Sequence, residues 1–211
     1  MRSVRIDSSS LTVLPVVKGL VSEGDTVAKA FEELTPDVIA VSISKEELTG
    51  LRNREDYDKY EPSDLEIIYQ AFLERFGEVQ IPPPAFVRAL ELSDRGGVPI
   101  VPLDMNDEVY TEAYCEHVRT RDMIKESFFA RRATGKKYDL STPHAFARSW
   151  DLRVNKPRGF RELELAREQH MAAALRNLTR NYRNVLAVVE CERSDGVLKY
   201  LDPAAEATAL I

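Results

Sequence analysis

The sequence contains little cysteine and little histidine, and this scarcity excludes several kinds of site. Its two cysteines, Cys115 and Cys191, form neither a metal-binding spacing nor a disulfide framework. None of the three histidines lies at metal-ligand spacing from another histidine or from a cysteine. We therefore expect no metal site, no cofactor and reduced thiols, which are typical of cytoplasmic proteins.

Several common motifs and segments are also missing. The chain has no phosphate-binding glycine loop, no nucleophile elbow and no HExxH motif. No apolar run approaches the roughly 20 residues of a transmembrane helix, and the opening MRSVRIDSSS lacks the apolar core of a signal peptide. The net charge of −6 argues against a nucleic-acid partner. We expect a cytoplasmic protein without a membrane span, and the sequence leaves homo-oligomerisation open.

The chain has the length and apolar content of one globular domain, residues 1–211. Expected strands lie at VRID, LTVLPVV, DVIAVSI, VPIVPLD and VLAVV, with helical patterns between most of them. Uninterrupted Val, Ile and Leu strands separated by helices are typical of a parallel sheet covered on both faces. We predict an α/β fold: a largely parallel central sheet of about four to five strands covered by helices, with an N-terminal β-hairpin.

Helix starts are marked in several places. Serine followed three residues later by glutamate predicts capping boxes at Ser44 and Ser63, and Asp25 is a candidate N-cap. Residues 134–157 instead show neither helical nor strand periodicity, and we predict an irregular loop or lid there. Charge is uneven: residues 21–78 carry 15 acidic and 6 basic residues, whereas residues 134–158 carry 2 and 6. Both segments are explained as solvated surface. The alternative is a regulatory module that acts through its acidic N-terminal half.

Arg167 is the most unusual charged residue, because it falls inside the apolar stripe of the predicted helix 158–184. That stripe comprises Phe160, Leu163, Met171, Leu175, Leu178 and Tyr182. A buried guanidinium needs an anionic partner. We expect Arg167 to pair with Asp104 at a strand end or with a bound anion; the alternative is a side chain that snorkels to water.

Polar residues gather where the predicted strands end, and ligands bind beyond the carboxyl ends of parallel strands. Lys18 and Arg193 are each the first cation after an apolar strand, just before a helix start that favours anions. In the segment ECER, residues 190–193, strand alternation would place Arg193 opposite Glu190 and Glu192. The predicted ligand-binding set is Lys18, Ser42, Asp104, Arg167 and Arg193, for an anionic small molecule or acidic peptide. The alternative is that these cations pair internally with the neighbouring carboxylates.

Three stretches resemble the TraB family, within the group that includes Tiki proteases, erythromycin-esterase-like and ChaN-like proteins. LTVLPVVKGLVSEG with LTPDVIAVSI resembles its opening Gly-x-x-His strand and the strand that follows. GVPIVPLDMND resembles its strand ending in Asp-Arg-Asp, and LAREQHMAAALRNLTRNYRNVLAVVECERSDGVLKYL resembles its closing helix and second Gly-x-x-His strand. The resemblance covers about half of the chain and implies the same α/β fold.

The departures from that family concern its metal-dependent chemistry. Lys18 stands at the first histidine position and Arg193 at the second, while Ser42 replaces an acidic residue. Arginine is never deprotonated and lysine rarely is, so these cations cannot ligate a metal. The resemblance therefore implies a non-catalytic, divergent member, a pseudoenzyme that binds an anionic ligand or acts as an interaction scaffold. The alternative is an active hydrolase with a rearranged site drawn from Asp104, Glu190, Glu192 and His170.

Overall fold

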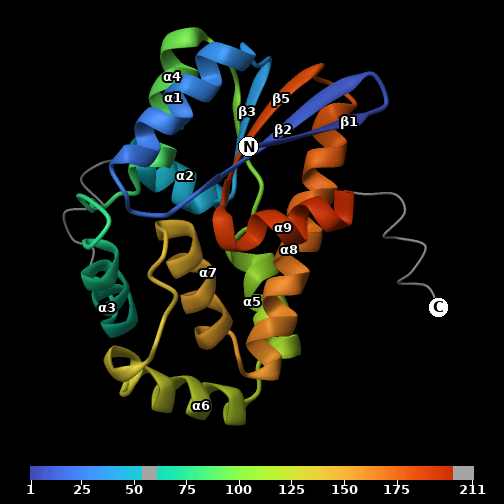
Figure 1. The fold of residues 1–211 in the computed structure, drawn as a ribbon. Helices are drawn as coiled ribbons and strands as arrows, with labels where there is room; N and C mark the ends of the chain where they lie inside the picture. Colours follow the sequence, from blue (N-terminus) through green and yellow to red (C-terminus); the bar gives the residue numbers. More distant parts are fainter. Residues whose placement is uncertain (54–60, 202–211) are drawn as a thin grey trace.

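The computed structural model describes residues 1–53 and 61–201, which form an α/β fold around one sheet (Figure 1). The strands are β1 (Arg2–Ile6), β2 (Ser9–Val16), β3 (Val38–Val41), β4 (Ile100–Pro102) and β5 (Asn184–Glu190). Their order is β1-β2-β5-β3-β4; β1 and β2 form an antiparallel hairpin, and the other neighbours are parallel. The predicted α/β class, mostly parallel sheet and N-terminal hairpin are therefore confirmed.

β5, the last strand in the sequence, lies between β2 and β3, which are the first two of the parallel strands in the sequence. The chain passes from β2 to β3 to β4 in one direction across the sheet and then returns to β5. Right-handed crossovers in opposite directions place their helices on opposite faces. All four parallel strands end at the same edge of the sheet, so the residues that follow them share one region.

Helices α1 (Ser22–Leu34), α2 (Lys45–Arg52) and α4 (Pro84–Gly96) pack on one face of the sheet. The capping box at Ser44 is confirmed: its Oγ accepts the Glu47 amide at 3.0 Å, and Glu47 accepts the Ser44 amide at 2.9 Å. Asp25 was wrongly predicted as an N-cap, because α1 begins three residues earlier. Asp25 lies in the first helical turn, where a carboxylate still favours the helix dipole.

The opposite face is covered by α8 (Arg158–Thr179) and α9 (Cys191–Leu201), with α5 (Asp107–His117) against α8 (Figure 1). The apolar stripe of α8 packs on the sheet as predicted, through buried side chains such as Met171 and Leu175. We expected α9 to start at the Ser-Asp-Gly step after ECER. Instead it begins at Cys191, directly after β5, so the strand alternation predicted for residues 190–193 does not apply.

A smaller aromatic cluster lies beyond the carboxyl ends of the strands. It joins α3 (Asp64–Leu73) to the segment after α6 (Thr120–Ala130), which contains the short η2 helix (Ala133–Gly135) and α7 (Pro143–Val154). Phe146 and Trp150 of α7 are buried there, and Tyr69 of α3 packs against both rings. Below the sheet in Figure 1, these helices enclose the strand ends from one side.

The irregular lid predicted over residues 134–157 is therefore wrong over most of its length. Thr142 caps α7 by accepting the Ala145 amide at 3.0 Å, and Pro143 occupies the first turn. Proline is favoured at that position because the first amides of a helix have no intrahelical partner.

Within the described ranges, no helix has both the length and the apolar character needed to span a bilayer.

The start of α8 packs very closely on the connection between α5 and α6. A Cβ atom on Gly159 would lie 2.6 Å from the His117 backbone oxygen and 2.8 Å from Asp122 Oδ2. A backbone oxygen cannot move aside without shifting α5, so Gly159→Ala is expected to lower the free energy of unfolding by about 1–3 kcal/mol. Gly135→Ala is the control, since nothing lies within 4 Å of its added methyl. Chemical denaturation that found both variants equally stable would contradict this packing.

Candidate functional site

Arg167 lies between two carboxylates, as the pairing hypothesis predicts. Its Nε donates to Asp104 Oδ2 at 3.1 Å, and its Nη1 donates to Glu164 Oε2 at 2.8 Å. The Arg167–Asp104 pair is thus confirmed, and the guanidinium does not snorkel away from the strand end. Asp104 Oδ1 also accepts the Met105 amide at 2.8 Å, which fixes the carboxylate at the end of β4.

Arg193 is buried in the first turn of α9 and faces carboxylates from two other helices. Its guanidinium lies 3.1 Å from Glu164 and 3.2 Å from Glu168, both on α8, and also pairs with Asp151 of α7. Internal ion pairing is therefore the outcome for Arg193, but with partners that differ from the predicted Glu190, Glu192 and Asp104. Because Glu164 contacts both arginines, the two guanidiniums belong to one network.

This network, hereafter the strand-end charge network, contains Asp104, Asp151, Glu164, Glu168, Arg167 and Arg193. Four carboxylates therefore share two cations. Burial raises the pKa of Glu168 to about 7 and that of Asp151 to about 6, although Arg193 opposes both shifts. The surplus of acid groups is thus relieved by bound protons near neutral pH.

Gly196 makes room for one of these carboxylates in the interior of α9. A Cβ atom at this position would lie 1.9 Å from Glu168 Oε2. Glycine in a helix interior costs about 1 kcal/mol relative to alanine, so a reason for its presence is expected. Here the reason is the close approach of Glu168 to α9, which brings its other oxygen to Arg193.

Lys18 lies apart from the two arginines, at the end of β2. Its Nζ is 3.7 Å from Glu190 Oε1, and its side chain remains 43% exposed. Burial opposes its charge, but the carboxylates of Glu190, Glu47 and Glu192 outweigh that effect, so the pKa of Lys18 is raised. Burial also disfavours the charge of Glu190 and therefore raises its pKa, although the nearby Lys18 acts in the opposite direction.

Ser42, predicted to bind a ligand, has a structural contact instead. Its buried Oγ accepts the Glu190 amide at 3.0 Å, which ties the end of β3 to the end of β5. Of the predicted ligand-binding set, Asp104, Arg167 and Arg193 come together in the strand-end charge network, Ser42 joins two strands, and Lys18 faces a cavity.

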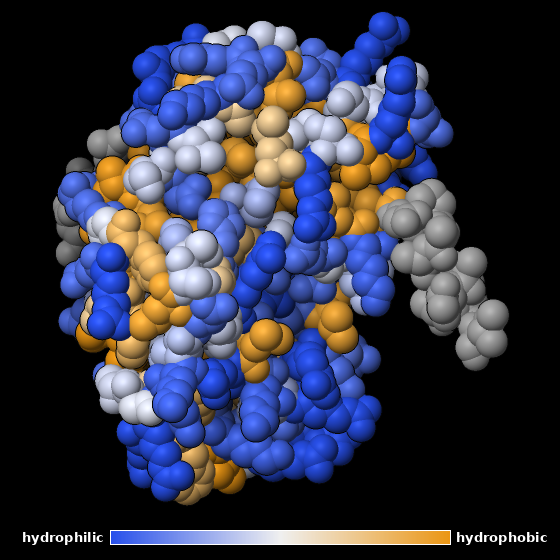
Figure 2. All heavy atoms as spheres, in the orientation of Figure 1, coloured by the Kyte–Doolittle hydropathy of each residue, from blue (hydrophilic) through white to orange (hydrophobic). Residues whose placement is uncertain are grey.

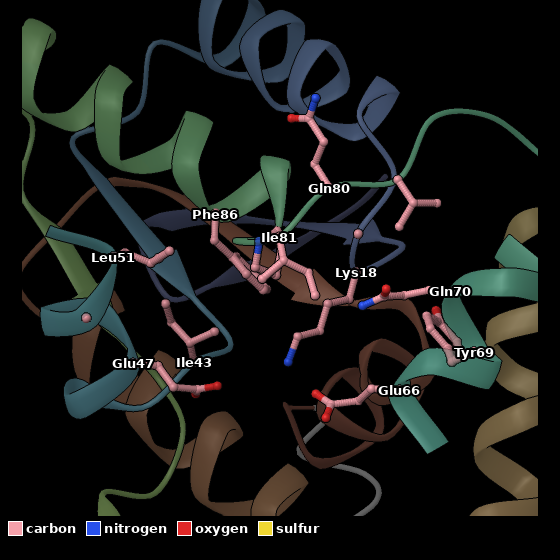
Figure 3. A pocket seen from close by; sticks show the side chains of 14 residues that line it. Lys18, Ile43, Glu47, Leu51, Glu66, Tyr69, Gln70, Gln80, Ile81 and Phe86 are labelled. Carbon is pink, nitrogen blue, oxygen red and sulfur yellow. The ribbon is translucent and has the colours of Figure 1, made fainter. Parts of the chain in front are cut away.

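That cavity, of about 330 Å³, lies between α2, α3 and the segment that leads into α4 (Figure 3). Most of its wall is apolar, from side chains that include Ile43, Leu51, Val79, Ile81 and Phe86. The Lys18 side chain extends into it and directs its ammonium towards the side where Glu47 and Glu66 lie (Figure 3). We call this space the Lys18 cavity.

Two further features set the polar end of the Lys18 cavity. Gly19 has a φ of +102°, which lets the chain turn sharply after β2 and hold Lys18 in place. The Tyr69 hydroxyl is buried in the wall, and among the described residues it has no hydrogen-bond partner. Glu47 and Glu66, by contrast, accept backbone amides in their capping boxes.

The four residues of the alternative catalytic site are not assembled around this cavity. Neither Asp104, Glu190, Glu192 nor His170 lines it. Asp104 is bound by Arg167, Glu190 pairs with Lys18, and Glu192 accepts from the Cys191 thiol at 3.2 Å. In the described part of the chain, no group of three or more His, Cys, Asp or Glu side chains is placed to hold a metal ion.

Sequence reasoning missed Asp151, Glu164 and Glu168 as partners of the arginines. Glu164 and Glu168 are four residues apart on α8 and border its apolar stripe, a pattern that indicates carboxylates at the edge of a buried face. Gly196, inside a helix, was a second available signal. Asp151 could not be identified, because α7 itself was not predicted.

Replacing Arg167 with Met is expected to destabilise the fold strongly, because Asp104 and Glu164 would lose a buried partner. Removing one member of a buried ion pair costs roughly 3–5 kcal/mol. The matched control is Arg158→Met on the same helix, where the arginine side chain is 74% exposed and its pair with Glu162 contributes little. Urea denaturation should separate the two variants clearly, and equal midpoints would refute burial of the pair.

The raised pKa values of Glu168 and Asp151 predict a pH-dependent stability. Between pH 4.5, the ordinary pKa of glutamate, and about 7, the folded chain holds a proton on Glu168 that the unfolded chain releases. The free energy of unfolding should therefore fall as pH rises through this range. We expect a higher Tm at pH 5.5 than at pH 8, and a weaker dependence in Glu168→Gln.

The control is Glu162→Gln, an exposed position on the same helix whose pKa is lowered by its hydrogen bond with Arg158. It should retain the parental slope between pH 5.5 and 8. A parental Tm that rises with pH over this interval would contradict the proposed proton uptake by the buried carboxylates.

Comparison with known proteins provides no family assignment. No protein-family model matches the chain, and no curated protein matches it either. The resemblance to the TraB family therefore rests on the quoted residues, and the role of this protein has to be inferred from the geometry of its own side chains.

Proposed function

We propose that this protein is a non-catalytic binding protein whose Lys18 cavity takes a small organic acid with an apolar body. The observation that carries the proposal is the state of Lys18. The Lys18 side chain lines an apolar cavity and is 43% exposed, and among the described residues its ammonium has only a 3.7 Å ion pair and no hydrogen bond. Three N–H donors are thus available to a carboxylate.

The size and the walls of the cavity define the rest of the ligand. At roughly 30 Å³ for a water-sized group, 330 Å³ holds on the order of ten non-hydrogen atoms. The apolar wall favours an aliphatic or aromatic body, which is the usual composition of small-molecule sites. The Tyr69 hydroxyl offers a second donor at the polar end, where a ligand acceptor would give it a partner.

The strand-end charge network supports a binding role rather than catalysis. Its carboxylates are bound by Arg167 and Arg193, so they already have cationic partners within the fold. The TraB-family resemblance fits the same proposal, because cations stand at both of its histidine positions.

Binding should be measured by calorimetry with a panel of six- to eight-carbon carboxylic acids and the matching alcohols and amines. Acids should bind, and Lys18→Gln should weaken them about ten- to a hundredfold, the usual value of a hydrogen bond to a charged group. Lys45→Gln, an exposed lysine on α2, is the control. Equal or absent binding across the panel would favour the ion-paired scaffold instead.

A variant of Tyr69 distinguishes a ligand contact from a structural role. Tyr69→Phe removes a buried hydroxyl that has no partner in the described residues, so the free protein should be at least as stable as the parent. The affinity for the acid should nevertheless fall. A loss of stability together with unchanged affinity would show that the hydroxyl serves the fold and not the ligand.

The pH dependence of binding gives an independent test. A ligand carboxylate beside Lys18 would raise the pKa of Glu190 further, since two anions would then share one cation. Binding is therefore coupled to proton uptake, and affinity should increase as pH falls from 8 to 6. Glu190→Gln should bind more tightly than the parent at pH 8 and show little pH dependence. Affinity that increases with pH would contradict this arrangement.

A further inference from the structure

Helix α6 turns its carboxylates towards the interior and three apolar side chains towards solvent, the opposite of a typical surface helix. Its carboxylates face inward: Asp122 is only 1% exposed, and Glu126 is half-buried. Three of its apolar side chains face outward, with Met123 46%, Ile124 52% and Phe128 56% exposed. Figure 2 shows hydrophobic side chains among hydrophilic ones at this lower end of the molecule. A soluble surface helix normally turns its apolar stripe towards the core.

The inward contacts of α6 fix this orientation. Asp122 Oδ2 accepts the Arg119 amide at 3.3 Å, and its carboxylate lies against the tightly packed Gly159 at the start of α8. On the next turns, the Phe129 ring packs edge-to-face on the buried Trp150. Rotating α6 to bury its outer apolar residues would break both contacts, so these side chains are held at the surface.

Cations surround the exposed apolar residues. Residues 119–137 contain seven basic and two acidic residues, a local charge of +5 in a protein of net charge −6. The seven are Arg119, Arg121, Lys125, Arg131, Arg132, Lys136 and Lys137. All seven are exposed, and no ion pair with a carboxylate is found for them within residues 1–53 and 61–201. Both acidic residues of the segment are those turned inward.

We propose that α6 docks this protein on an anionic membrane surface as a peripheral interfacial helix. The outer side chains would insert at the level of the lipid headgroups, and the cations would lie against lipid phosphates and carboxylates. A basic face combined with protruding aliphatic and aromatic side chains is the signature of such helices. This role does not depend on the Lys18 cavity.

The chemistry of the surface selects a membrane over other anionic partners. A nucleic-acid site would combine the cations with aromatic rings on which bases stack. Met123 and Ile124 have no aromatic ring, and Phe128 is the single outward aromatic ring of α6. The three side chains protrude from a convex helix and do not line an enclosed groove. The neighbouring hollow between α3 and α6 is open, and Asp64 lies on its rim.

Co-sedimentation with sucrose-loaded vesicles tests the proposal on the full chain. Vesicles of phosphatidylcholine with 30% phosphatidylserine should sediment the protein at 100 mM salt. Pure phosphatidylcholine should not, and 500 mM salt should release most of the bound protein. Ile124→Ser with Phe128→Ser should lower the partition coefficient at least tenfold. Lys125→Gln, Arg131→Gln and Arg132→Gln should each lower it about fivefold.

Matched controls change the same residue types at other exposed positions. Leu152→Ser with Leu165→Ser, and Arg5→Gln with Lys29→Gln and Arg183→Gln, should bind as the parent does. Near-ultraviolet circular dichroism of Trp150 verifies that every variant is folded.

Three results would overturn the proposal. The first is no sedimentation with anionic vesicles, and the second is binding that the α6 variants leave unchanged. The third is a dimer of the parent, measured by light scattering, that the Ile124 and Phe128 changes convert to a monomer without any vesicle binding. That result would assign the surface to a second copy of the chain.

Discussion

The buried contact of Arg193 with Glu164 and Glu168 is the constraint on which the centre of this molecule depends. It joins α9, which follows the last strand directly, to α8, which covers one face of the sheet. Through Glu164 it extends to Arg167 and to Asp104 at the end of β4. One run of alternating charges therefore fixes two strand ends and two helices relative to one another. Removing either arginine would leave at least one buried carboxylate without its cation.

The same network lies beyond the carboxyl ends of the strands, the region where parallel sheets usually bind a ligand. Four carboxylates and two guanidiniums occupy the space beyond β4 and β5, and α7 covers them with Asp151 and the aromatic cluster. Lys18, at the end of β2, escapes this arrangement because the sharp turn at Gly19 directs the chain towards α1. The cavity is lined by residues that follow β2 and β3, including Lys18, Gly19 and Ile43.

The sequence carries much of the fold because its strands and helix caps are strong local signals. Apolar runs identify β2 to β5, the alternating VRID identifies β1, and the serine-glutamate pairs at Ser44 and Ser63 mark two helix starts correctly. The exception is α7. Residues 134–157 were predicted to be irregular, whereas Pro143 lies in the first turn of α7 and Pro157 occupies the N-cap position of α8. A proline at a helix start favours the helix, and only its position relative to the cap distinguishes the two cases.

The site is less predictable, because it depends on which side chains meet across the fold. The pair of Arg167 with Asp104 could be predicted, since a cation within an apolar stripe requires an anion and a strand end supplies one. The partners of Arg193 could not, because β5 ends at Glu190 and the strand alternation expected through Arg193 does not occur. Once Cys191 begins a helix, Arg193 faces α8, and the candidate anion-binding cation becomes a structural one.

Inward-facing carboxylates are common to the strand-end charge network and to helix α6. Carboxylates turn inward at Glu164 and Glu168 on α8, and again at Asp122 on α6. Around the strand ends, buried arginines and raised pKa values accommodate that charge. Within residues 1–53 and 61–201, Asp122 pairs with no cation and accepts the Arg119 backbone amide, while the basic side chains of its segment are exposed. In α6, therefore, the carboxylates face the interior and the basic side chains face solvent. Residues 119–137 thus give this acidic protein a positively charged surface on the helix whose apolar side chains are exposed.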